Sequence, residues 1–221
     1  MLMKEAREKI VAFGKRMEAD GLTLGTAGNI SIFDPELRLM AISPSGIPYE
    51  KTTPEDIVIL DEEGNVVEGE RKPSSEYLLH GAFYKTDPEA RAVVHTHSMY
   101  CTILACMGEP LRSVHYAIAE AQTDEIPLVP YHTFGTPELA NDAVKYCGDG
   151  DAVLLANHGI MVCGKNLKST FGLAKNLEYI AELQYRAMCI GKPNVLTKAE
   201  MDEVFESFKS YGQPNSGKKG Y

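Results

Sequence analysis

Two histidines separated by a single residue, His95 and His97, are the residues of this sequence whose type and spacing first suggest chemistry. They follow the run Ala92 to Val94, whose small and β-branched side chains are typical of a buried strand. Because side chains two apart on a strand point to the same face, both imidazoles can reach one metal ion. Two ligands do not complete such a site, so a third must come from elsewhere in the chain.

A further histidine, His158, ends a second apolar run at 152–156. If the two strands lie side by side, His158 can join His95 and His97. Three neutral imidazoles with an open position are the ligand set of a catalytic zinc ion, and nitrogen ligands also accept manganese, iron or cobalt. A carboxylate can close such a site in the resting state. Glu76 is the candidate, because it directly follows a pair of serines.

The other three histidines, His80, His115 and His132, are interpreted as ordinary core or surface residues. A lone histidine in an apolar context is more often a hydrogen-bonded group than a metal ligand. These three therefore receive no role from the sequence.

Three segments precede the histidines: loops at 25–29 and 43–46, which combine glycine with hydroxyl side chains, and 72–76, which contains two serines. Backbone amides in such loops can approach an anion closely. The third loop places Ser74 and Ser75 in the first turn of an expected helix that continues to Lys85, where unsatisfied amides favour a phosphate group. Ordinary turns and serine capping explain the same residues without a ligand, so both interpretations stay open on these residues alone.

The elements that must position these residues alternate between hairpins and helices. We expect helices at 2–20, 98–107, from Thr136 onward, at 167–190 and at 197–210, and strands at 29–33, 37–42, 57–61, 65–68, 126–131, 152–156 and 160–163. This mixture predicts a single α/β domain with a mainly antiparallel β-sheet between layers of α-helices. The domain should span residues 1–211, and the polar tail at 212–221 should be mobile.

The composition bounds the class of protein. A length of 221 residues with 44% hydrophobic and 24% charged residues suits one large globular domain. With 22 Lys and Arg against 31 Asp and Glu and no basic stripe, nucleic acid is not an expected partner. The five cysteines lack C-x-x-C spacing, as is typical of reduced cysteines in the cytoplasm. No apolar run is long enough to indicate export or membrane insertion.

A series of short motifs in fixed order resembles the class II aldolase and adducin head domain family, and within it the L-fuculose-1-phosphate aldolase type. The family also contains L-ribulose-5-phosphate 4-epimerases and the adducin head domain, which keeps the fold without the metal chemistry. Because all the candidate ligands are present, the resemblance favours an enzyme. The motifs are Gly25-Thr26-Ala27-Gly28-Asn29, Ser43-Pro44-Ser45-Gly46-Ile47-Pro48-Tyr49, Pro73-Ser74-Ser75-Glu76, His95-Thr96-His97, His115-Tyr116, Thr133-Phe134-Gly135-Thr136 and Asn157-His158-Gly159, and they extend over nearly the whole chain.

The resemblance implies a role for each site residue. One divalent metal ion per subunit, zinc in the first instance, would bind Glu76, His95, His97 and His158, and the substrate would displace Glu76, which then exchanges a proton on the three-carbon fragment. The phosphate pocket would consist of Thr26, Gly28, Asn29, Ser45, Gly46, Ser74 and Ser75. Tyr116 from a neighbouring subunit would exchange the proton at the aldehyde oxygen, Tyr211 would fold over the aldehyde end, and Phe134 and Phe208 would form an apolar wall.

The activity implied is metal-dependent retro-aldol cleavage of a ketose 1-phosphate by a homotetramer with active sites at subunit interfaces. L-Fuculose 1-phosphate, which gives dihydroxyacetone phosphate and L-lactaldehyde, is the first expected substrate. Aldolases for 5-deoxyribulose 1-phosphate or methylthioribulose 1-phosphate are alternatives, because one or two carbons in a pocket are worth only about 1 to 3 kcal/mol. The 4-epimerase and a non-catalytic assembly module are further alternatives.

Overall fold

One sheet of eight strands forms the centre of the molecule, in a computed structural model that describes residues 1–210. Its strand order is β4-β3-β2-β1-β5-β10-β9-β8, and every neighbouring pair is antiparallel except β8 with β9. This arrangement confirms the mainly antiparallel sheet expected from the sequence. The strands are β1 Asn29–Asp34, β2 Leu39–Ile42, β3 Val58–Leu60, β4 Val66–Glu68, β5 Ala92–Thr96, β8 Leu128–Val129, β9 Ala152–Leu155 and β10 Gly159–Gly164.

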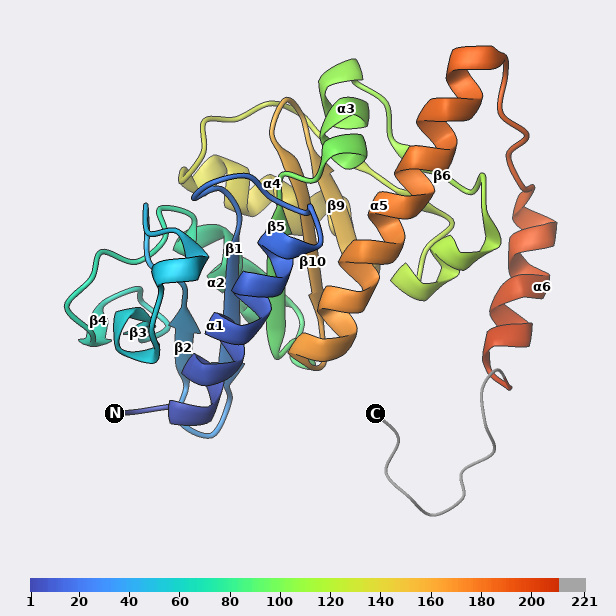
Figure 1. The fold of residues 1–221 in the computed structure, drawn as a ribbon. Coiled ribbons are helices and arrows are strands. Elements are labelled where there is room, and N and C mark those ends of the chain that lie inside the picture. The colour runs from blue at the N-terminus through green and yellow to red at the C-terminus, as the bar shows by residue number, and fades with distance from the viewer. Residues whose placement is uncertain (211–221) are drawn as a thin grey trace.

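Helices cover both faces of this sheet, as Figure 1 shows. In that view α1 and α5 lie in front of the sheet, and α2 and α4 lie behind it. Short 3-10 segments and a small second sheet of β6 and β7 complete the described chain. The bounds are α1 Lys4–Ala19, α2 Tyr77–Thr86, α3 Met99–Met107, α4 Pro137–Cys147, α5 Leu167–Ile190, α6 Lys198–Phe208, η1 Tyr49–Lys51, η2 Pro54–Asp56, η3 Tyr116–Ala121, β6 Leu111–Arg112 and β7 Glu125–Ile126.

The molecule has two hydrophobic cores, one on each face of the sheet, because side chains along the central strands point alternately to the two faces. On β5, Val94 packs into the core beneath α1, α3 and α5, whereas its neighbour Val93 packs into the core beneath α2 and α4. Ile160 and Met161 on β10 divide in the same way. Both faces of β5 are fully buried, which explains its unbroken apolar sequence before His95.

The helix ends follow local capping signals. Helix α5 covers the predicted range, and its first turn is capped by the Asn166 side chain, which accepts a hydrogen bond from the amide of Ser169 at 2.9 Å. Helix α4 is capped by Thr136, whose hydroxyl accepts from the amide of Leu139 at 3.3 Å. These caps depend on residues close in sequence, so they could be recognised without the fold.

Two expected elements differ in the structure. Helix α2 begins at Tyr77, so Ser74 lies before the helix instead of in its first turn. The amide of Ser74 donates to the carbonyl of Ser43 at 3.0 Å, which holds this segment in a strand-like bridge. The strand expected at 126–131 is divided at Pro127, which lacks an N–H for a continuous ladder, and its two halves join different sheets.

Three predictions fall at the end of the chain. The domain boundary at Tyr211, the role of Tyr211 and the tail at 212–221 all lie outside the described residues.

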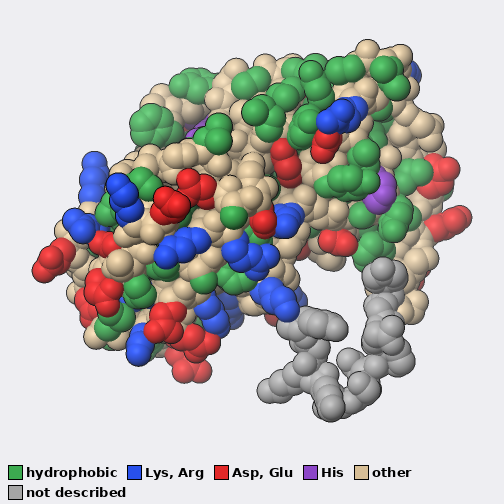
Figure 2. All heavy atoms as spheres, viewed as in Figure 1, with side chains coloured by type: hydrophobic (Ala, Val, Ile, Leu, Met, Phe, Trp, Pro, Cys, Tyr) green, Lys and Arg blue, Asp and Glu red, His purple; other side chains and the backbone are tan. Residues whose placement is uncertain are grey.

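The surface carries charges of both signs. Figure 2 shows Lys and Arg side chains lying among Asp and Glu side chains on the face in view. Among the described residues, no helix is long and apolar enough to cross a lipid bilayer.

Candidate metal centre and active site

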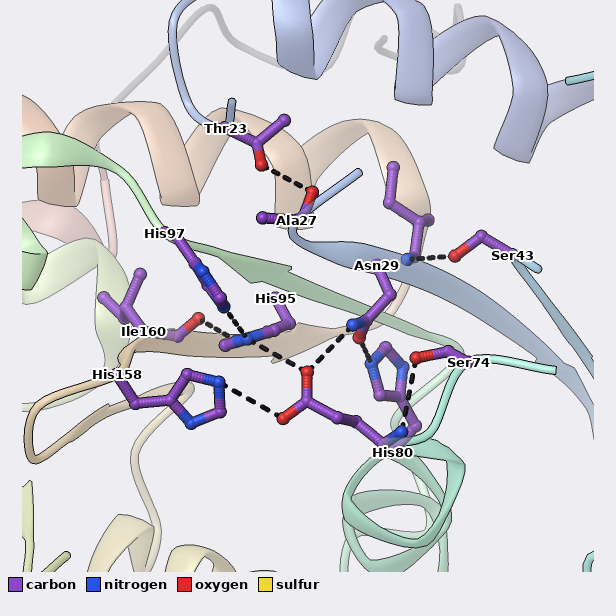
Figure 3. A network of polar contacts seen from close by, with 12 residues as sticks. Thr23, Ala27, Asn29, Ser43, Ser74, His80, His95, His97, His158 and Ile160 are labelled. Carbon is purple, nitrogen blue, oxygen red and sulfur yellow. Dashed lines mark hydrogen bonds and ion pairs between the residues drawn. The ribbon is translucent and has the colours of Figure 1, made fainter. Parts of the chain in front are cut away.

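Four candidate ligands converge at one end of the central strands. Each of Glu76, His95, His97 and His158 offers a ligand atom, and these atoms all lie within 4.8 Å of one another. His95 lies on β5, and His97 directly follows that strand. His158 precedes β10, and the antiparallel pairing of β5 with β10 brings it close to them. Figure 3 shows the three imidazoles pointing toward one another.

Two glycines allow this convergence. A Cβ atom at Gly159 would lie 2.3 Å from the carbonyl oxygen of Thr96, so only glycine lets His158 approach β5 this closely. Gly28 has a φ of 75°, and a Cβ atom there would lie 2.9 Å from the carbonyl oxygen of His95. The loop at 25–29 therefore packs directly against the strand that carries the histidines.

The ring nitrogen of His95 that faces the other ligands is an acceptor. Nδ1 of His95 lies 3.0 Å from the carbonyl oxygen of Ile160, so it carries the proton and Nε2 keeps its lone pair. That Nε2 lies 2.9 Å from Nε2 of His97 and 3.2 Å from Oε2 of Glu76. Burial and the neighbouring imidazoles lower the pKa of His95 to about 3, against the opposing charge of Glu76, so the ring is neutral.

Glu76 contributes a charged carboxylate oxygen that has no hydrogen-bond donor. Its side chain is buried, and Oε1 accepts no hydrogen bond although Nε2 of His158 lies 3.3 Å away. Burial raises the pKa of this carboxyl, whereas positive charge at His95 and His158 together with a hydrogen bond from Asn29 would lower it to about 2. Because the ring of His95 is neutral, it does not supply the positive charge that this buried carboxylate needs.

This donor set fits a divalent cation. Three imidazole nitrogens and one carboxylate oxygen are ligands typical of zinc, and a cation among them would satisfy both the lone pairs and the orphaned Oε1. The hydrogen bond from Nδ1 of His95 to a backbone carbonyl is the orienting contact that metal-ligating histidines usually make.

A cavity of about 360 Å³ opens beside these ligands. Its lining includes every residue for which the family resemblance implies a place in the phosphate pocket. None of its lining residues, all described, is a lysine or arginine. The lining consists of Thr26, Ala27, Gly28, Asn29, Pro44, Ser45, Gly46, Ser74, Ser75, Glu76, His97, Tyr131, His132, Phe134, Asn157 and His158.

Two expected site residues lie elsewhere in this chain. Tyr116 begins η3, stacks on His115 with ring centroids 4.7 Å apart, and is 52% exposed. Its ring centroid lies 6.4 Å from that of Phe208 on α6. Neither Tyr116 nor Phe208 lines the cavity beside Glu76, whereas Phe134 does.

Sequence reasoning missed two histidines near the site. His132 lines the cavity, and its Nε2 donates to Oδ2 of Asp142 at 2.8 Å. His80 is fully buried behind Asn29, which lies beside Glu76. For His80, the spacing of four residues from Glu76 at the start of an expected helix is the signal that could have placed both on one face.

Comparison with known proteins agrees with this geometry. Residues 8–185 match the family model described as the class II aldolase and adducin N-terminal domain. A 5-deoxy-D-ribulose 1-phosphate aldolase of Bacillus thuringiensis serovar kurstaki is 47% identical over 213 residues, which cover 96% of this chain and 100% of the relative. The L-fuculose phosphate aldolase of Escherichia coli strain K12 is 41% identical over 193 residues, covering 87% of this chain and 88% of that protein.

A solved structure shows the same fold. An L-fuculose 1-phosphate aldolase superposes with a TM-score of 0.91 at 43% sequence identity, covering 95% of this chain and 98% of the other. The family assignment from sequence motifs is thus confirmed. The chain belongs to the class II aldolase and adducin N-terminal domain family, and it is an aldolase of that family.

Proposed function

We propose that this aldolase cleaves a ketose 1-phosphate between C3 and C4 and releases dihydroxyacetone phosphate and a short aldehyde. The observation that carries the proposal is the position of the ligand cluster in the wall of a cavity lined by small and hydroxyl residues. One end of that cavity offers Glu76 and the imidazoles. The other offers neutral hydrogen-bond donors of the kind that hold phosphate in loop-bound sites.

The phosphate would be bound by hydroxyls and loop amides. The amide of Ser45 already donates to the carbonyl of Lys72, and that of Ser74 donates to Ser43, each at 3.0 Å. Ser45 and Ser74 would therefore contact phosphate through their hydroxyl groups. Ser75 is exposed in the cavity and adds a third hydroxyl at the start of α2.

Glu76 would carry a proton during cleavage. A divalent cation bound by the four ligands, zinc in our proposal, would act as a Lewis acid for the negative charge that develops on the sugar oxygens. When the C3–C4 bond breaks, its electron pair stays with the three-carbon fragment, and C3 must receive a proton. Burial raises the pKa of the Glu76 carboxyl, so once substrate displaces Glu76 from its contacts with the imidazoles, the carboxyl would take up a proton more readily and deliver it to C3.

The proton at the aldehyde oxygen would be exchanged by Tyr116 of a neighbouring copy. The exposure of Tyr116 and its position away from the cavity of its own chain support this assignment. Phe208 lies near Tyr116, so the same copy would supply it to the apolar wall that meets Phe134. We propose a homotetramer with active sites at subunit interfaces, in the cytoplasm, and Tyr211 as the residue that covers the aldehyde end.

The three candidate substrates differ in the half of the sugar that is released as the aldehyde. We favour 5-deoxyribulose 1-phosphate, because the relative named for that substrate is 47% identical and matched over its full length. L-Fuculose 1-phosphate, the first expectation from the sequence, becomes the second candidate, supported by the superposition at a TM-score of 0.91. Methylthioribulose 1-phosphate is the third, since relatives named for it and for 5-deoxyribulose 1-phosphate are 41% identical or less.

Product analysis tests the proposal. The zinc-loaded protein is incubated separately with the three ketose 1-phosphates and with L-ribulose 5-phosphate, and the products are identified by mass spectrometry. We expect dihydroxyacetone phosphate from all three ketose 1-phosphates, with the highest kcat/KM for 5-deoxyribulose 1-phosphate. Formation of D-xylulose 5-phosphate alone would show an epimerase and overturn the proposal, as would the absence of any cleavage.

A further inference from the structure

A chain of buried hydrogen bonds runs from the core to Glu76. The hydroxyls of Tyr84 and Ser31 lie 2.6 Å apart, and Oγ of Ser31 lies 2.6 Å from Nδ1 of His80. Nε2 of His80 hydrogen-bonds to Oδ1 of Asn29. Nδ2 of Asn29 then donates to Oε2 of Glu76 at 3.0 Å. Figure 3 shows Asn29 and His80 to the right of the three imidazoles.

The carboxylate of Glu76 determines which atom donates and which accepts at each hydrogen bond of this series. An ionised Glu76 can only accept, so Asn29 must turn its NH₂ group toward Oε2 and its carbonyl oxygen toward His80. The reversed amide would place two oxygens 3.0 Å apart with no proton between them. His80 therefore carries its proton on Nε2 and accepts from Ser31 on Nδ1.

His80 is suited to hold this direction. Its ring is 0% exposed, and both of its nitrogens have partners. Burial lowers the pKa of His80 to about 4 against the attraction of Glu76, so the ring is neutral and offers one donor and one acceptor. Ser31 is also fully buried, so water does not compete for these contacts.

These hydrogen bonds hold the side chains in place and do not conduct protons. A proton that travelled from His80 to Glu76 would have to pass through the amide of Asn29, which donates and accepts at different atoms and does not protonate in water. The contribution of His80 is thus one of orientation.

We propose that His80 is a positioning residue, which acts through Asn29 to set the orientation of Glu76 and the donors that Asn29 presents to the cavity. This inference rests on the proposed function of the cluster. In the resting site, the amide holds Oε2 of Glu76 beside His95. After substrate displaces Glu76, the same NH₂ group remains turned toward the cavity, which Asn29 lines, and is available to the phosphate.

Two substitutions separate orientation from packing. In His80→Gln the side-chain amide nitrogen lies near the position of Nε2 and can still donate to Asn29. In His80→Asn the shorter amide lies near the position of Nδ1, so it can still contact Ser31 but does not reach Asn29. Both remove the ring and leave polar groups of the same kind, so each controls for the other.

The test measures zinc affinity by competition with a chelator, together with the visible spectrum of the cobalt-substituted protein. We expect His80→Asn to lose about 10- to 100-fold in zinc affinity and to change the cobalt spectrum. His80→Gln should stay within about threefold of the unsubstituted protein, because the contact with Asn29 is kept. Equal zinc affinities and equal spectra in the two variants would overturn the inference.

A measurement on the unsubstituted protein covers the case in which both variants fail to fold. Nitrogen-15 chemical shifts of the histidine rings report which nitrogen of His80 bears the proton. A proton on Nε2 supports the inference, and one on Nδ1 overturns it, because the amide of Asn29 would then be reversed. None of these readouts needs turnover, so an unsubstituted protein that cleaves no ketose 1-phosphate would overturn the proposed function alone.

Discussion

Two buried charged side chains, Arg7 and Glu76, illustrate opposite uses of a buried charge. Arg7 is 1% exposed and Glu76 is 5% exposed. Arg7 on α1 donates to the carbonyls of Leu2 at 2.8 Å and Pro54 at 3.1 Å, and its Nη2 lies 2.7 Å from Oε1 of Glu68. It also donates to the carbonyl of Ile57, which joins the helix to the strand β3 region.

Glu76 has the opposite surroundings. One of its oxygens accepts only from Asn29, and the other accepts no hydrogen bond while facing an imidazole nitrogen. A buried polar group without a partner costs about 1 to 3 kcal/mol, and a cation bound at this oxygen would offset that cost. A buried charge with complete partners therefore supports the fold, whereas convergent acceptors mark a binding site for a cation.

The largest expected effect is loss of the metal. In His97→Ala the cluster loses one of three imidazoles, and we expect zinc binding to fall below detection and cleavage to fall by about 10³-fold or more. The fold should persist, because His97 lies after β5 and lines a cavity. Zinc content per chain and dihydroxyacetone phosphate release measure the two effects. Unchanged activity with zinc still bound would show that His97 is not a ligand.

Replacing the charged oxygen should separate metal binding from proton transfer. We expect Glu76→Gln to retain zinc on the three imidazoles but to lose about 10²- to 10⁴-fold in kcat, because an amide carries no exchangeable acid proton of suitable pKa. Without metal, this variant should unfold at the same temperature as the unsubstituted protein or above it, since the substitution removes a buried unpaired charge. Turnover equal to that of the unsubstituted enzyme would exclude Glu76 as the proton carrier.

The substitution Arg7→Leu tests whether the fully hydrogen-bonded buried charge supports the fold. We expect the free energy of unfolding to fall by about 3 kcal/mol, because several carbonyl oxygens lose their donor. Urea denaturation measures this change. The kcat of the folded variant should match that of the unsubstituted enzyme, and a large fall in kcat without loss of stability would contradict the division between the two regions.

The smallest expected effect concerns the phosphate end. Ser75→Ala removes one exposed hydroxyl from the cavity, and we expect KM for the ketose 1-phosphate to rise roughly tenfold with little change in kcat. Initial-rate kinetics measure this change, with Ser169→Ala as the control, an exposed serine outside the cavity lining. An unchanged KM would remove Ser75 from the phosphate pocket.

Local signals carried most of the fold prediction. The range of helix α5 was predicted from the sequence, as was β5 from its apolar run, which is buried on both faces. The start of α2 could not be placed, because the bridge between Ser74 and Ser43 joins residues distant in sequence. The capping interpretation of the serines was reasonable locally, but long-range pairing decided the backbone.

The sequence predicted which residues form the site but not how they are arranged in space. The sequence indicated that His95 and His158 end two strands, but only the pairing of β5 with β10 makes those ends neighbours. His80 was missed because its importance comes from Asn29 and Ser31, which lie on β1 and become its partners only in the fold. The roles of Tyr116 and Phe208 stay predictions, since they depend on contacts between copies.

Removal and return of the metal tests the central claim most directly. The protein is stripped with a chelator, zinc is titrated back, and bound zinc and dihydroxyacetone phosphate release are measured on the same samples. We predict that the metal-free protein is folded but inactive, and that activity returns in proportion to zinc up to one equivalent per chain. Cleavage at the full rate by the metal-free protein would contradict the assignment of Glu76, His95, His97 and His158 as a catalytic metal site.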